Sequence, residues 1–117
     1  MREVRRAIPT ALLSALVALM LGAAAPAFAQ VDAEAAQALA KKSNCLKCHS
    51  VSAKKEGPPF KETAAKFKGK ADGEQKLYVH LTTSPKVKVD GKEEEHDNVK
   101  SKNESEVRNV VKWILAQ

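Results

Sequence analysis

The chain has 117 residues, enough for one small domain, and its 20 basic and 14 acidic side chains give a formal charge of +6. This charge does not indicate nucleic-acid binding. Part of it lies in the first six residues, and no aromatic side chains alternate with the later lysines to form stacking platforms.

The first 29 residues have the order of parts found in a secretory signal peptide. Arg2, Arg5 and Arg6 precede an apolar run from Ala11 to Ala25, and Ala27-Phe28-Ala29 supplies a small-x-small cleavage pattern. An uncleaved membrane anchor is the alternative, but the run is short for a span of about 20 residues. We therefore expect cleavage after Ala29, a mature domain of residues 30–117 with a formal charge of +4, and no stable membrane insertion.

Helical patterns dominate the mature domain. Asp32 is a candidate N-cap for a helix that runs to Asn44 and presents a face of small residues. Residues 60–68 form a second helical stretch after a Gly-Pro-Pro stop. A third begins at Asp72 or Gly73 and ends before Pro85, because the residue preceding proline disfavours helix.

The last helix has the clearest signals. Asn103 and Glu106 have the spacing of a capping box, and five apolar residues then follow at helical spacing: Val107, Val110, Val111, Ile114 and Leu115. Between Pro85 and Lys102 helical periodicity is absent. Asp90-Gly91 is a tight-turn signal there, which leaves a short hairpin and a solvated loop as equal alternatives.

Cys45, Cys48 and His49 form a C-x-x-C-H segment, which is the sequence signature of covalent haem c attachment. The two thiols would form thioethers with the haem vinyl groups, and His49 would be the proximal iron ligand. A thioredoxin-like dithiol is a weaker alternative, since no strand–helix–strand pattern surrounds the motif. A zinc site would need a second ligand pair, which is missing, and a structural disulfide is the remaining alternative.

The domain resembles the small bacterial class I cytochromes c. Four segments carry the resemblance: Leu39–Lys42 leading into the haem motif, Gly57–Lys61, Ala64–Gly69 and Val111–Leu115. The resemblance implies an all-α, cytochrome c-like fold of about four short helices around one covalent haem, located in the periplasm. It also implies that the carbonyl of Pro58 accepts a hydrogen bond from His49, which would orient the imidazole and strengthen it as a donor.

The sequence departs from this family at the sixth iron ligand, which is usually a methionine. Met1 and Met20 are the methionines of the chain, and both precede the mature domain. His96 lies before the last helix, where the family supplies that ligand, and is our candidate. His80 is the competing candidate, although its place in a helix favours a hydrogen bond to a haem propionate. Lysine ligation or an open position are further alternatives.

Two functions follow from these alternatives. Ligation by His49 and His96 predicts an electron carrier with a potential lower than that of methionine-ligated relatives. A labile sixth ligand would instead permit a haem-based binder or sensor of carbon monoxide or nitric oxide. We expect the protein to have no catalytic residues of its own. We also expect it to be a monomer or an electron-transfer subunit of an enzyme. Its redox partners would carry acidic docking surfaces facing four lysines: Lys42, Lys47, Lys54 and Lys55.

Overall fold

The computed structural model describes residues 30–117, so the expected signal peptide and its cleavage site lie outside the described residues. Within this described part, five helices and two strands follow one another in this order: α1 (Ala33–Lys42), α2 (Cys45–Cys48), α3 (Phe60–Phe67), α4 (Gly73–Thr82), β1 (Lys86–Val89), β2 (Lys92–Glu95) and α5 (Glu104–Leu115). Across residues 30–117, none of the helices has the length and apolar character required to span a membrane.

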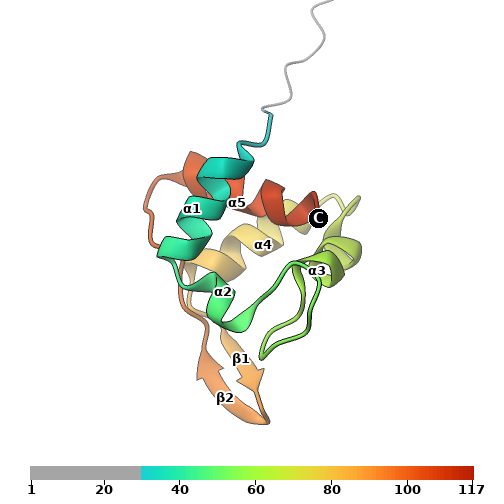
Figure 1. Ribbon diagram of the computed structural model, residues 1–117, viewed down its shortest axis with the longest axis vertical. Coiled ribbons are helices and arrows are strands. Elements are labelled where there is room, and N and C mark those ends of the chain that lie inside the picture. The colour runs from blue at the N-terminus through green and yellow to red at the C-terminus, as the bar shows by residue number, and fades with distance from the viewer. Residues whose placement is uncertain (1–29) are drawn as a thin grey trace, which may run out of the picture.

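Helix α5 lies at the centre of the fold, and α1, α3 and α4 all pack against it (Figure 1). Val107, Val110 and Val111 are its most deeply buried side chains. Ala36 and Ala40 on α1 are buried as well, and their small side chains allow α1 to approach α5 closely. The small-residue face and the apolar stripe expected from the sequence therefore meet in one core.

Both terminal helices are capped as their sequences predict, with one difference. The Asp32 side chain accepts a hydrogen bond from the backbone N–H of Ala35, and Asn103 Oδ1 accepts from the N–H groups of Ser105 and Glu106. The reciprocal half of the capping box is absent at Asn103. The Glu106 carboxylate accepts instead from Ser101 Oγ, and the same hydroxyl accepts the backbone N–H of Asn103.

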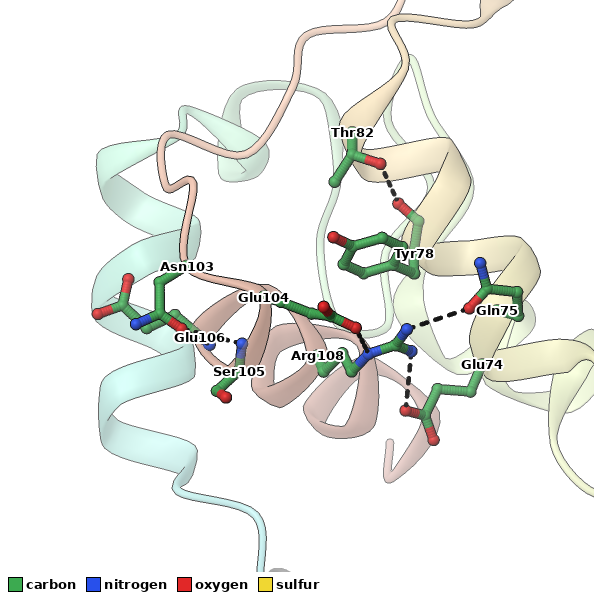
Figure 2. A network of polar contacts seen from close by, with 9 residues as sticks. All are labelled: Glu74, Gln75, Tyr78, Thr82, Asn103, Glu104, Ser105, Glu106 and Arg108. Atoms are coloured by element: carbon green, nitrogen blue, oxygen red, sulfur yellow. Dashed lines mark hydrogen bonds and ion pairs between the residues drawn. The ribbon is translucent and has the colours of Figure 1, made fainter.

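Arg108 joins α4 to α5 (Figure 2). Its guanidinium donates to Glu104 Oε1 at 2.7 Å on its own helix and to Gln75 Oε1 at 3.2 Å on α4. It also lies over the ring of Tyr78, 4.4 Å from the centroid, and Glu74 is 3.5 Å away. These contacts fix α4 against the centre of the fold.

The segment after α4 forms a hairpin, which decides between the two alternatives left open by the sequence. Strands β1 and β2 pair antiparallel from Lys86 opposite Glu95 to Val89 opposite Lys92. Asp90 and Gly91 have φ values of 49° and 79°, as a two-residue turn with two left-handed positions requires. The strands pack chiefly against each other, and the hairpin extends away from the helices (Figure 1).

Helix α2 is the element that the sequence patterns did not predict, so the expectation of about four helices is one short. The first helix ends at Lys42 rather than Asn44, and Asn44 adopts a left-handed conformation with φ of 59°. Asparagine tolerates that conformation better than most residues. The chain thereby changes direction, and a separate helical turn begins at Cys45.

Candidate functional site

A cavity of about 600 Å³ lies between the helices and the hairpin. Its size falls in the range of about 300–1,000 Å³ that is usual for small-molecule and cofactor sites. Six residues singled out in the sequence line it: Cys45, Cys48, His49, Pro58, His80 and His96. The fold therefore brings together side chains that are up to 51 positions apart in the sequence.

The single turn of α2 places both cysteines beside the cavity. Cys45 and Cys48 are three residues apart, a spacing that puts two side chains on the same face of a helix. His49 follows immediately in an extended conformation, with φ of −123° and ψ of 153°. This change from helical to extended backbone separates the imidazole from the two thiols and leaves it on the cavity wall.

Three neighbours hold the ring of His49. Its Nδ1 donates a hydrogen bond to the carbonyl oxygen of Pro58 at 2.8 Å. The ring of Phe60 stacks on it with centroids 5.4 Å apart and planes 20° from parallel. A Cβ added at Gly57 would lie 2.4 Å from His49 Cε1, so only glycine leaves room for the ring. With Nδ1 occupied, Nε2 is the nitrogen that remains to bind a metal.

His96 lines the same cavity as His49. Their ring centroids are 6.1 Å apart, and their planes differ by 50°. The fold therefore brings the two imidazoles, 47 positions apart in the sequence, close together beside one cavity.

The backbone and the ring of His96 are held differently. Its backbone N–H donates to the carbonyl of Pro85 at 2.8 Å, which closes the base of the hairpin. Its Nδ1 is buried and has no hydrogen-bond partner. Burial lowers the pKa of the imidazole, with a smaller contribution from His49 in the same direction, while the backbone and the carboxylate of Asp97 partly oppose this shift. A lowered pKa favours the neutral ring, the form that binds metals.

His80, on α4, lines the cavity next to His96. The centroids of the His80 and His96 rings are 4.4 Å apart, with planes 55° apart. Burial is the main cause that lowers the pKa of His80, followed by the proximity of His96 and His49. The expected hydrogen bond from His80 to a haem propionate stays a prediction.

Neither thiol has the properties of a redox dithiol. Cys45 and Cys48 are not joined by a disulfide. Burial raises the pKa of the Cys45 thiol, and a hydrogen bond from Cys48 Sγ to Glu56, at 3.2 Å, raises that of Cys48. Thiol–disulfide enzymes need the opposite, a lowered pKa that produces the thiolate.

The lysines expected around the site are exposed, and their surroundings are not uniformly basic. Lys55 donates to the carbonyl of Leu46 at 2.7 Å and so braces the loop after the haem motif. Glu56 lies beside Cys48, and Glu94 on β2 lines the cavity. The rim therefore carries both signs of charge, which the lysines alone did not indicate.

Gly57 and Phe60 are the functional residues that the sequence patterns missed as contacts of His49. The Gly57-Pro58-Pro59 run predicts the end of a helix. It does not indicate that the ring of His49 packs against Gly57. Phe60 begins α3 and stacks edge to face with Trp113 of α5 at 5.4 Å, so it connects His49 to the core. The available signal was the glycine eight residues after His49.

Residues 33–117 match the family described as Cytochrome c. The chain belongs to the cytochrome c family. Cytochrome c-551 of Pseudomonas aeruginosa is 33% identical to it over 85 residues, which are 73% of this chain and 79% of that protein.

Solved structures of two other cytochromes resemble this cytochrome in sequence and fold. Class 1 cytochrome MtoD from Sideroxydans lithotrophicus ES-1 shares 47% identity with a TM-score of 0.71, covering 74% of this chain and 97% of that one. Cytochrome c552 of Nitrosomonas europaea shares 30% identity with a TM-score of 0.56, covering 68% and 95%. The all-α, class I fold expected from the sequence is thus confirmed.

The residues of this cytochrome fit the cofactor of its family, one covalent haem c. Two unpaired thiols and an imidazole with its Nδ1 already hydrogen-bonded line a cavity of suitable size. When bound, the haem supplies an iron that gains and loses one electron. Cys45 and Cys48 would attach it, and Pro58, Gly57 and Phe60 would keep the imidazole of His49 in place beside it.

Proposed function

We propose that this cytochrome is an exported, periplasmic carrier of single electrons whose haem iron is ligated by both His49 and His96. Its haem is attached through Cys45 and Cys48. Because imidazole donates more electron density to iron than a thioether does, the reduction potential lies below that of relatives with a methionine ligand.

The observation that supports this proposal is the pair of neighbouring imidazoles that line one cavity. His96 has a ring centroid 6.1 Å from that of His49, and its buried Nδ1 lacks a partner. Residues 30–117 contain no methionine that could take its place. A haem iron with two protein ligands keeps no open position for a substrate, so exchange of an electron is the reaction left to it.

The direct test replaces His96 by alanine. We expect the His96→Ala holoprotein to lose the low-spin, bis-imidazole spectrum of the native ferric protein, and added imidazole to restore it. The reduction potential rises in the variant without imidazole. Near-infrared magnetic circular dichroism and a redox titration measure both effects. Lys92→Ala is the control, since Lys92 is exposed on β2 and does not line the cavity.

His80 requires a second variant because it lies close enough to replace the lost ligand. Its ring centroid is 4.4 Å from that of His96. A His80→Ala/His96→Ala double variant therefore removes both imidazoles, and it loses bis-imidazole ligation whether or not His80 rescues the single variant. An unchanged spectrum in the double variant would contradict the assignment of either histidine as the sixth ligand.

A haem-based ligand sensor is the second candidate, and the exposure of the hairpin favours it. Every residue of β2 is exposed, so the segment that delivers His96 has few neighbours to hold it. The buried ring and the backbone bond to Pro85 oppose its release. Carbon monoxide added to the reduced protein separates the two functions, because rapid binding indicates a sensor and resistance to binding indicates a carrier.

Partner proteins with acidic docking surfaces remain our proposal for electron exchange. The four exposed lysines Lys42, Lys47, Lys54 and Lys55 lie near the haem motif in the sequence and support it. Steering by these charges makes the bimolecular electron-transfer rate with an anionic partner fall as ionic strength rises. A rate that increases with salt would instead indicate that Glu56 and Glu94 dominate the docking face.

A further inference from the structure

The two imidazoles proposed to hold the iron differ in what their second nitrogen contacts. His49 Nδ1 donates to the Pro58 carbonyl at 2.8 Å, whereas His96 Nδ1 is buried without any hydrogen bond. Histidines that bind metals almost always donate the N–H of the other ring nitrogen to an acceptor, which fixes the tautomer and the ring orientation. His96 therefore lacks the acceptor that His49 has.

His80 is a polar side chain beside this ring. The backbone of Asp97 also interacts with the ring, but it makes no hydrogen bond of acceptable geometry with Nδ1. The two ring centroids are 4.4 Å apart, close enough for direct contact between the rings. The carbonyl of Pro85 is less suitable, because it already accepts the backbone N–H of His96 at 2.8 Å. A neutral imidazole carries one acceptor nitrogen, so His80 can receive an N–H and keep its own for another partner.

His80 is placed more firmly than His96. It follows buried Leu77 by three residues and precedes buried Leu81, so its position is determined by the packing of α4. Helix α4 is in turn tied to α5 through Arg108 (Figure 2). His96 instead follows the exposed strand β2. A contact between the two rings would connect the hairpin to the rigid part of the fold.

We propose that His80 is a positioning residue for His96, which accepts the Nδ1–H of His96 while Nε2 of His96 faces the iron. This inference rests on the bis-histidine ligation proposed above. The ring centroids are 4.4 Å apart, so the bond requires a change in the orientation of the rings and no movement of α4. Its consequence is a stronger donor at the iron, because an imidazole that shares its proton carries more negative charge. Ferric iron is stabilised, and the ring of His96 keeps one orientation.

The test compares replacements of His80 in the holoprotein. His80→Phe keeps an aromatic ring of similar shape but removes both nitrogens, while His80→Asn and His80→Gln each retain an amide oxygen as acceptor. Val79→Ala is the matched control on the same helix, since Val79 is 44% exposed. The readouts are the reduction potential and the hyperfine-shifted proton resonance of His96 Nδ1–H.

We expect His80→Phe to shift the ferric-to-ferrous ratio at a fixed ambient potential toward ferrous by up to about tenfold, the scale of one net hydrogen bond. The Nδ1–H resonance should broaden or move, and at least one amide variant should restore both readouts. The control should change neither readout.

Three results would overturn the inference. In the first, His80→Phe retains the native potential and resonance. In the second, His80→Phe shifts the potential without moving the Nδ1–H resonance, as a hydrogen bond to a propionate would. In the third, neither amide restores the native values, which attributes the effect to packing. Failure of the ligation itself is recognised separately, by a native spectrum in His96→Ala and in the double variant.

Discussion

The two histidines proposed as iron ligands are held in place in different ways. His49 lies next to the cysteines proposed to attach the haem, and Pro58, Gly57 and Phe60 hold its ring within a short stretch of chain. His96 lies at the end of an exposed hairpin, and its ring contacts His80 from a distant helix. A ligand encoded by a local motif is therefore recognisable from the sequence, whereas a ligand placed by tertiary structure is not.

Replacement of Cys45 and Cys48 should give the largest effect. It should distinguish haem attachment from ligation by His96. In Cys45→Ser/Cys48→Ser the hydroxyl oxygens form no thioether, so we expect no covalent haem on a denaturing gel stained for haem. His96→Ala should retain covalent haem on the same gel. Loss of covalent haem in His96→Ala would contradict the prediction that attachment through Cys45 and Cys48 does not depend on His96.

Gly57→Ala should give the next largest effect, because it changes the space around the ring of His49. The added methyl would lie 2.4 Å from His49 Cε1, so the ring or the loop must move. Overpacking of this kind lowers the free energy of unfolding by about 1–3 kcal/mol. Denaturant unfolding of the ferric holoprotein measures the change, and the iron spectrum should change with it.

Gly69→Asn is the control for that substitution. Gly69 has φ of +77°, which asparagine tolerates, and a Cβ there would meet no atom within 4 Å. We expect little change in stability. Equal effects at Gly57 and Gly69 would indicate that the loss of glycine flexibility, rather than contact with His49, is responsible.

Gly91→Val should act on the hairpin that leads to His96. Gly91 has φ of +79°, and a β-branched residue in that conformation costs about 1–2 kcal/mol. Because the strands pack chiefly against each other, we expect this cost to loosen the hairpin more than the core. Carbon monoxide should bind the reduced variant faster than the native protein, while Gly91→Asn should behave like the native protein.

Lys86→Ala should have the smallest effect. Lys86 Nζ and Glu93 Oε1 are 2.9 Å apart across the hairpin, with side chains that are 71% and 58% exposed. Exposed ion pairs contribute at most about 1 kcal/mol, and salt screens them. We expect a free energy of unfolding within a few tenths of 1 kcal/mol of the native value. A larger loss would show that the hairpin is coupled to the core more tightly than its contacts indicate.

Local signals were sufficient for most of the fold. Asp32 and Asn103 mark helix starts through their own side chains, and Asp90-Gly91 predicts the tight turn that the structure contains. Helix α2 was missed because it depends on a left-handed Asn44, a conformation that no periodicity reveals. Glu106 also differs, since Ser101 competes for its carboxylate.

The site was predictable only in part, for a physical reason. The spacing of Cys45, Cys48 and His49 is imposed by the haem itself, so the sequence must display it. The space beside Gly57 and the contact between His80 and His96 depend on how segments pack, and packing leaves no fixed spacing in the chain. The absence of methionine from residues 30–117 was the one indirect signal that pointed toward His96.

The bond between the backbone of His96 and the carbonyl of Pro85 closes the hairpin at its base, where both ends of the segment leave the body of the protein. Segments whose ends are fixed close together tolerate exchange and insertion well. Residues 86–95 can therefore be replaced as a unit. A segment of different length or charge could be grafted between Pro85 and His96 to change the surroundings of the cavity, while the α1–α5 core keeps its packing.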